Sequence, residues 1–278
     1  MMHSRMADTN LPTPSERTAT EQDALLSFAP GRLFFGVRNG DGLKALVDEK
    51  VRSLHDFQSL YFDKPLIGYP YRTVSLFLDG GEVYDFVPAA FVSDEQSLSL
   101  WLPGLPESDR IIRERFADQG FELVSALSED LAEFVSRSFS RYTFSHPVTG
   151  LVQAALQSSR LSGARVLFGA VSRIGGEDVL DLVLASGGRV CFANRFFLHG
   201  ETDALYFVTS VWRAEGLDRE EDAFRLFGDQ ITPGMSAALA PIKKAVKSFE
   251  INSFSELGRE LPGAENFPAL LRLKMLCA

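Results

Sequence analysis

The residues with the clearest potential for chemistry lie in turns that follow apolar, strand-like runs. The turn at 172–178 holds two glycines and ends in Glu177 and Asp178, and the turn Gly228-Asp229 follows the run 224–227. Glycine-rich turns point backbone N–H groups at phosphates, and carboxylates beside them hold Mg²⁺. The matching turn of the first half, 29–32, holds one glycine and no acid, and its proline has no N–H to donate. Together these turns resemble an incomplete phosphate site.

Two interpretations are open for each turn of the second half. The turn that ends at Asp178 is either a phosphate-binding loop or a plain hairpin turn, because hairpins favour the same residues. Gly228 is either a contact to a ligand or partner at the carboxyl end of a strand, or the glycine that a strand-to-helix turn requires. In an actin-like ATPase, a pair of glycines after the fourth strand packs against the adenosine of the nucleotide. Asp229 stands in place of the second glycine, and its side chain would crowd the adenine base.

Three further polar residues are candidate contacts. His146 lies in a Ser-His-Pro turn between a strand and a helix, where it is either a hydrogen-bonded structural residue or a cleft contact. Asn194 and Arg195 form a polar pair inside an apolar run. We expect Arg195 to pair with Asp203 or Glu201 nearby, with a binding role as the alternative.

Several chemistries lack the residues they need. The four histidines, at positions 3, 55, 146 and 199, never stand at metal-ligand spacing with Cys or another His. No nucleophile-elbow or Gly-x-x-x-x-Gly-Lys-Ser/Thr motif occurs. A two-metal nuclease requires a carboxylate in the first strand of its domain, and neither 24–29 nor 164–171 contains one. We therefore assign no catalytic residue and no metal ligand.

Composition narrows the class of partner. The chain has 278 residues and a formal net charge of −9, without a long basic run, which argues against nucleic acid. No apolar run reaches the ~18–20 residues of a membrane helix, and the first twenty residues lack the apolar core of a secretion signal. We expect no membrane insertion and a cytoplasmic location. Cys191, inside a strand-like run, is expected to be buried, and Cys277 is the second cysteine.

The second half of the chain has a regular order of predicted elements. Three strands are followed by a helix after Thr202, a strand, a helix after Thr232 that Pro241 should kink, and a last strand. The predicted strands are 164–171, 178–184, 189–196, 223–227 and 248–251.

The first half opens with the same plan. Strands are predicted at 24–29, 32–38 and 43–51, followed by a helix at 54–62. Later elements are strands at 73–78, 82–87, 121–127 and 142–145, and helices at 108–118, after Ser128 and at 148–157. We therefore predict an α/β protein of two ribonuclease H-like βββαβαβ domains, arranged as an actin-like ATPase fold. The predicted divisions are a disordered tail (1–20), a first domain (21–162), and a second domain with a C-terminal helical tail (163–278).

Several short stretches together resemble a bacterial domain-of-unknown-function family with an actin-like ATPase fold. The stretches are Phe86-Val87-Pro88, His146 followed by Thr149, Ala193–Phe196, Thr202–Tyr206 and Leu226-Phe227-Gly228-Asp229. The stretch 121–156 is also similar to pilus-assembly actin-like proteins and to the cytoplasmic domains of type II secretion proteins. The resemblance implies a fold and a scaffold-like role, and no established activity.

We expect a catalytically inactive binding or scaffold protein whose nucleotide cleft has degenerated. Its partner is a protein or a small ligand, and it needs no cofactor. The alternative is a divergent ATPase or phosphotransferase that binds ATP and Mg²⁺ through Asp178, Asp181 or Asp229. A third hypothesis is a homo-oligomer formed through exposed strand edges or a Phe-rich surface.

Overall fold

The first five-stranded sheet is formed by the N-terminal part of the chain. The computed structural model describes residues 13–40, 42–79, 84–92, 101–102, 109–254 and 263–277. In this N-terminal sheet the strand order is β3-β2-β1-β4-β8. The first three strands are antiparallel, whereas β4 runs parallel to β1 and β8 parallel to β4. The strands are β1 (Asp23–Ala29), β2 (Arg32–Asn39), β3 (Gly42–Glu49), β4 (Thr73–Leu78) and β8 (Tyr142–Ser145).

The C-terminal sheet repeats this arrangement with the order β11-β10-β9-β12-β13. Three antiparallel strands are again followed by two that run parallel to the first. The strands are β9 (Val166–Ile174), β10 (Glu177–Ser186), β11 (Arg189–Leu198), β12 (Ala223–Phe227) and β13 (Ser248–Ile251). The predicted order of elements in this half is confirmed.

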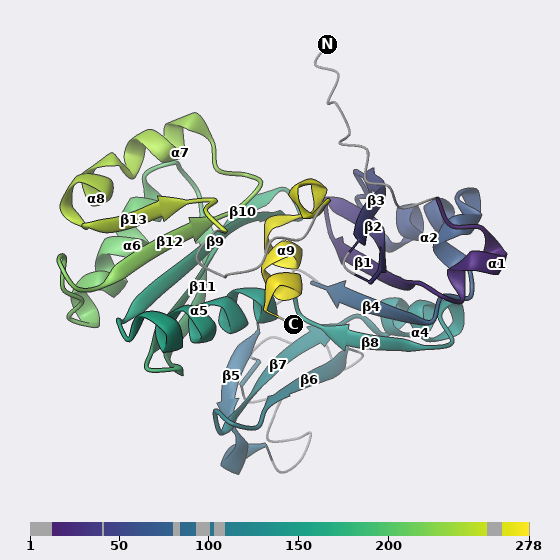
Figure 1. The fold of residues 1–278 in the computed structure, drawn as a ribbon, viewed down its shortest axis with the longest axis horizontal. Helices are drawn as coiled ribbons and strands as arrows, with labels where there is room; N and C mark the ends of the chain where they lie inside the picture. The colour runs from purple at the N-terminus through teal and green to yellow at the C-terminus, as the bar shows by residue number, and fades with distance from the viewer. Residues whose placement is uncertain are drawn as a thin grey trace.

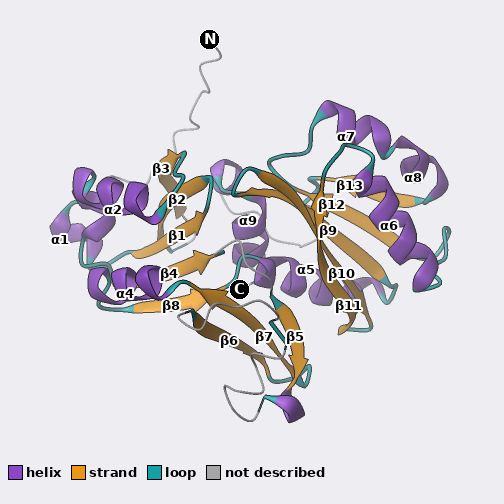
Figure 2. Ribbon diagram, turned by 180° about the vertical axis from the view of Figure 1, so that it is seen from behind, coloured by secondary structure: helices purple, strands orange, loops and turns teal. Residues whose placement is uncertain are grey.

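Helices cover the outer face of each sheet (Figures 1 and 2). On the N-terminal sheet α2 (Leu54–Asp63) and α4 (Glu129–Ser138) bury Phe57 and Val135 in one core. On the C-terminal sheet α6 (Asp203–Ala214), α7 (Pro233–Ala238) and α8 (Ala240–Ala245) do the same. The helix predicted after Thr232 divides at Leu239, as expected with a proline at position 241.

Helices α5 (Val148–Ser162) and α9 (Ala269–Leu276) lie between the two sheets (Figure 1). Helix α5 packs on the inner face of the C-terminal sheet. The short turn η4 (Ala264–Asn266), Phe267 and α9 cover the inner face of the N-terminal sheet. The two helices cross so closely that a Cβ at Gly150 would overlap the Leu270 carbonyl oxygen. The C-terminal helix therefore completes the core of the sheet that begins the chain.

A third, three-stranded sheet is inserted into the N-terminal half. Its order is β5-β7-β6, with β5 (Asp85–Pro88), β6 (Arg110–Phe116) and β7 (Phe121–Leu127). It projects away from the two larger sheets (Figures 1 and 2). The predicted helix at 108–118 is therefore wrong. Its apolar residues fit both a helical and an alternating pattern, and antiparallel pairing with β7 decides for the strand. The first residues of the strand predicted at 82–87 lie outside the described residues.

Short helical elements and the exposure of one cysteine add detail that the sequence did not predict. The described part of the predicted tail contains a helix, α1 (Glu16–Ala19), which Ser15 caps and which buries Ala19. Two 3₁₀ turns follow later, η1 (Pro65–Gly68) and η2 (Ala89–Phe91). Cys191 is exposed and not buried as expected, because β11 is the edge strand of its sheet.

The contact between α5 and α9 yields a test of packing. Replacing Gly150 by alanine adds about 1 kcal/mol of helix propensity. The new Cβ, however, would lie 2.8 Å from the Lys274 backbone nitrogen, and a helix backbone cannot move away as a side chain can. We expect Gly150→Ala to lower the free energy of unfolding by about 1–3 kcal/mol in urea titrations. In the control, Gly200→Ala, the new Cβ has no atom within 4 Å, so the change should stay within about 0.5 kcal/mol.

Candidate functional site

The turns that would flank nucleotide phosphates in an actin-like ATPase touch each other. One is the β1–β2 turn at Pro30-Gly31, and the other is the β9–β10 turn at Gly175-Gly176. The N–H of Gly175 donates to the carbonyl of Pro30 at 2.6 Å. A phosphate group cannot lie between atoms at hydrogen-bond distance. The Gly175 N–H of the second turn therefore faces the first turn at this point.

Asp229 and Arg32 close the same region with an ion pair. Arg32 Nη1 lies 2.5 Å from Asp229 Oδ2, and its Nε and Nη2 donate to Asp48 at 2.8 and 2.9 Å. Burial acts to lower the pKa of Arg32, but the carboxylates of Asp48 and Asp229 raise it above its usual value. The Asp229 carboxylate thus joins the C-terminal sheet to the N-terminal one.

Gly228 has a structural role in the turn after β12. Its φ is +148°, and a Cβ there would overlap the Val171 carbonyl oxygen on β9. Its N–H donates to Asn252 Oδ1 at 2.9 Å, and its carbonyl accepts from Asn252 Nδ2 at 3.1 Å. The interpretation as a turn glycine accounts for all of these contacts.

Two other candidates have partners on neighbouring residues. Asp178 accepts two hydrogen bonds from Arg173, at 2.7 and 2.9 Å, across its own hairpin. Asn194 is exposed on the edge strand β11, where its Oδ1 accepts from the Arg195 N–H at 2.9 Å. The contacts of these two residues thus lie within their own hairpin and strand, whereas Asp229 contacts Arg32 of the other sheet.

Arg195 lies at the centre of a buried cluster of charges. Its Nη2 donates to Asp79 Oδ2 at 2.8 Å and its Nε to Asp181 Oδ1 at 2.8 Å, and all three side chains are at most 4% exposed. Asp79 follows β4 of the N-terminal sheet, whereas Asp181 and Arg195 lie on β10 and β11. The guanidinium fork matches carboxylates on two sides. The cluster therefore bridges the two sheets.

Tyr84 and His146 complete this cluster from the N-terminal half. The Tyr84 hydroxyl donates to Asp181 Oδ1 at 3.0 Å, and the Arg195 guanidinium stacks 4.9 Å from the centre of its ring. His146 Nε2 lies 3.5 Å from Asp79 Oδ2. Its Nδ1 accepts from the Val148 N–H at 3.2 Å, which leaves the proton of the neutral ring on Nε2, facing Asp79. We call Asp79, Tyr84, His146, Asp181 and Arg195 the buried network.

Charges of opposite sign hold Asp79 and Arg195 of the buried network in their ionised forms. Burial acts to raise the pKa of Asp79, but the Arg195 and His146 side chains hold it well below its usual value. Burial acts to lower the pKa of Arg195, but Asp181 and Asp79 hold it well above its usual value. Burial and the Asp181 carboxylate together raise the pKa of Tyr84 well above 10, so its hydroxyl is protonated and able to donate.

The buried network differs from the sequence-based expectation for Arg195. The predicted pairing with Asp203 or Glu201 is wrong, because Asp203 instead accepts from the backbone of His199 and Gly200. The sequence analysis did not single out Asp79 or Tyr84. A signal existed for Asp79, since it follows the apolar run of β4 at the carboxyl end of a parallel strand. Nothing in the local sequence marks Tyr84.

The described residues offer no alternative ion site. Among them, no three His, Cys, Asp or Glu side chains gather closely enough to hold a metal ion.

In the same part of the chain, every helix is too short or too polar to span a lipid bilayer.

Comparison with protein families gives one match. A family described as "Protein of unknown function (DUF3822)" matches residues 18–240. A comparison with curated proteins gave no match.

Solved structures share the fold at low sequence identity. One is a protein of Bacteroides thetaiotaomicron described as having an actin-like ATPase fold and unknown function, with a TM-score of 0.75, 16% identity, and coverage of 88% of this chain and 93% of that one. Another is described as the PilM-PilN type IV pilus biogenesis complex, with a TM-score of 0.52, 13% identity, and coverage of 93% and 99%. These matches confirm the predicted actin-like fold and the family resemblance.

Removing the charge at the centre of the buried network should destabilise the protein strongly. Arg195→Met leaves the Asp79 and Asp181 carboxylates buried without a cation, which costs about 3–5 kcal/mol in the free energy of unfolding. Arg173→Met removes an arginine with the same two-bond geometry from an exposed pair, and should cost less than about 1 kcal/mol. Denaturant titrations compare the two. Equal losses in the free energy of unfolding would contradict the expectation that burial makes the loss of Arg195 more costly than the loss of Arg173.

The same network predicts a dependence of stability on pH. The folded-state pKa of Asp79 lies below its unfolded value of about 3.9, so its contribution is complete above that pH and is lost as the pH falls. We expect the free energy of unfolding to decrease below about pH 4. In the triple variant Asp79→Asn, Asp181→Asn, Arg195→Met this decrease should be shallower. Urea titrations between about pH 3 and 6 measure it, and equal slopes would show that other carboxylates cause the acid instability.

Proposed function

The chain belongs to the family described as Protein of unknown function (DUF3822), and we propose that it is a cytoplasmic, catalytically inactive binding protein. In this proposal the actin-like fold is held in one closed arrangement by the chain's own side chains, without nucleotide. The molecule then serves as a rigid surface for a partner protein.

The hydrogen bond from Gly175 to Pro30 is the observation that carries this proposal. An actin-like ATPase needs both turns free to point N–H groups at phosphates that lie between them. Here the proline of the first turn has no N–H, and its carbonyl accepts the N–H of the second turn.

Internal ion pairs take the place of bridging by a nucleotide and its metal. At the turns, Arg32 connects β2 to Asp229 beyond β12. In the interior, Arg195 connects the C-terminal sheet to Asp79. Each pair provides both charges from the chain itself, so closure of the two sheets requires no added anion or cation.

The residues around the turns also support a lack of hydrolysis. Metal-assisted phosphoryl chemistry needs carboxylates that are free to hold Mg²⁺. Asp178 is held by Arg173, and Asp229 by Arg32. Asp181 is 0% exposed and is paired with Arg195. Each acid of the ATPase alternative therefore already has a cation as its partner.

The proposal of a protein partner rests on the solved structures. The PilM structure is described as a complex with PilN, and it shares the fold of this chain over almost its whole length. An actin-like fold is thus found in a protein complex, and we transfer only the general role of binding a protein partner. The partner of this chain is a protein in our proposal, and nucleotide is not required for binding it.

Thermal denaturation with ATP and Mg²⁺ tests the proposal. A ligand at a hundred times its Kd adds about 2.7 kcal/mol to the stability of the folded state, which raises Tm by several degrees. We expect no such rise, and no release of phosphate from ATP. A saturable rise in Tm that is abolished in Asp229→Ala would overturn the proposal in favour of a divergent ATPase. Glu133→Ala serves as the matched control, since its carboxylate lies in an exposed pair with Arg137 on α4 and belongs to none of the candidate sites.

A further inference from the structure

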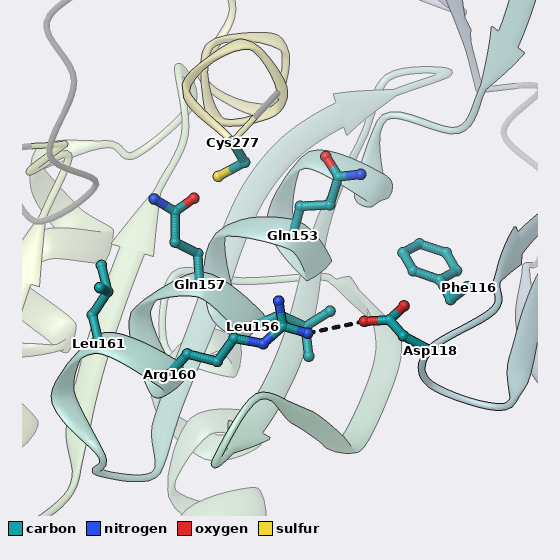
Figure 3. A pocket seen from close by; sticks show the side chains of 8 residues that line it. All are labelled: Phe116, Asp118, Gln153, Leu156, Gln157, Arg160, Leu161 and Cys277. Carbon is teal, nitrogen blue, oxygen red and sulfur yellow. Dashed lines mark hydrogen bonds and ion pairs between the residues drawn. The ribbon is translucent and has the colours of Figure 1, made fainter.

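A cavity of about 410 Å³ lies on the side of α5, away from the contact between the turns. It is bounded by α5, by the β6–β7 turn of the inserted sheet and by Cys277 at the end of α9 (Figure 3). Its lining residues are Phe116, Asp118, Gln153, Leu156, Gln157, Arg160, Leu161 and Cys277.

The cavity lies where α5, the inserted sheet and the C-terminal sheet meet. Gln119, next to the lining residue Asp118, donates to the Gly188 carbonyl at 3.0 Å and accepts from the Val190 N–H at 3.3 Å. These bonds attach the β6–β7 turn to the β10–β11 turn of the C-terminal sheet. Arg160 packs on Gly188 so closely that a Cβ there would overlap its side chain. An occupant of the cavity would thus touch elements that the fold already holds in fixed positions.

The charges of the lining favour an uncharged ligand over an ionic one. Arg160 is the cation of this lining, and its Nη2 lies 2.9 Å from Asp118 Oδ2 (Figure 3). A phosphate or carboxylate ligand would have to compete with that carboxylate. Burial raises the pKa of the Cys277 thiol to about 11, so it is a neutral thiol and not a thiolate nucleophile or metal ligand. The cavity therefore suits an uncharged ligand.

The remaining walls match a peptide. Leu156 and Phe116 provide an apolar floor, and both are less than 9% exposed. The carboxamides of Gln153 and Gln157 rise from α5 toward Cys277 (Figure 3), and each offers donors and an acceptor like those of a peptide backbone. Gln153 Oε1 has no hydrogen-bond partner among the described residues. It is a buried acceptor that lacks a donor such as a peptide N–H would supply.

The rim distinguishes a peptide from a small molecule. Leu161 lies at the edge of the cavity and is 70% exposed. A small molecule inside the cavity would leave this leucine in water, whereas a chain that runs across the rim would cover it. We propose that this cavity binds an uncharged, extended peptide segment of a partner protein, with one apolar side chain on the floor and its backbone on the two carboxamides. This inference rests on the proposed partner-binding function.

Selection of peptides on the intact protein tests this site. The probe is a phage-displayed library of random dodecapeptides, and the selected sequences are synthesised with a fluorescent label for anisotropy titrations. We expect selected peptides to be uncharged and to contain an apolar side chain. Leu161→Glu should weaken their binding about tenfold or more. Tyr206→Ala, at a residue 65% exposed on α6, should leave the Kd within about twofold.

The two cysteines of the chain provide an internal control. A peptide in the cavity should slow the alkylation of Cys277 by N-ethylmaleimide at about pH 9, where more of this thiol is ionised than at neutral pH. Exposed Cys191 on β11 should react at an unchanged rate, and mass spectrometry reads both sites. The proposed site would be overturned by peptides whose affinity for Leu161→Glu equals that for the original chain and which leave the alkylation of Cys277 unchanged. Failure to select any peptide would overturn the proposal that the ligand is a peptide. Neither result changes the ATP titration, so the site and the inactive-cleft proposal fail separately.

Discussion

The buried ion pairs of Arg195 constrain the whole molecule. One guanidinium and two carboxylates are removed from water, and removing charges from water costs several kcal/mol for each ion unless the geometry is well matched. The fork of Arg195 meets Asp79 of one sheet and Asp181 of the other, both at 2.8 Å, so it bridges the two sheets directly. Any opening would separate these charges inside the protein. The relative position of the two sheets is therefore fixed at this point.

The contact between the turns follows from this constraint. Arg32 and Asp229 are 35% and 38% exposed, so water and salt weaken their attraction far more than that of the interior charges. Such a pair cannot by itself hold two sheets together, but it can close a gap that the interior has already narrowed. The Gly175 N–H then reaches the Pro30 carbonyl. The contact between the turns thus lies at the exposed edge of an arrangement that the buried network holds together, and the acids near the turns have cations as partners.

The C-terminal residues contribute to the same closed arrangement. The inner face of the N-terminal sheet, with Phe34 and Phe77, is covered by Phe267 and by α9 from the far end of the chain. Helix α5 fills the inner face of the other sheet and contacts α9 at Gly150. The core of the first sheet is complete only when the last segment has packed. Helix α9 therefore contributes side chains to the inner cores of both halves.

Local sequence patterns predict the order of strands and helices in the second half and in the opening of the first, because alternating apolar residues, turn glycines and capping residues act locally. They leave Gly228 open between a turn glycine and a ligand contact, and its positive φ is the kind of local requirement that the first interpretation describes. Only the tertiary structure decided the strand at Arg110–Phe116, whose apolar residues fit two periods until β7 pairs with it. It also decided the partner of Arg195, because Asp79 lies 116 positions away. Burial and contacts between distant segments exist only after folding, so no local pattern encodes them.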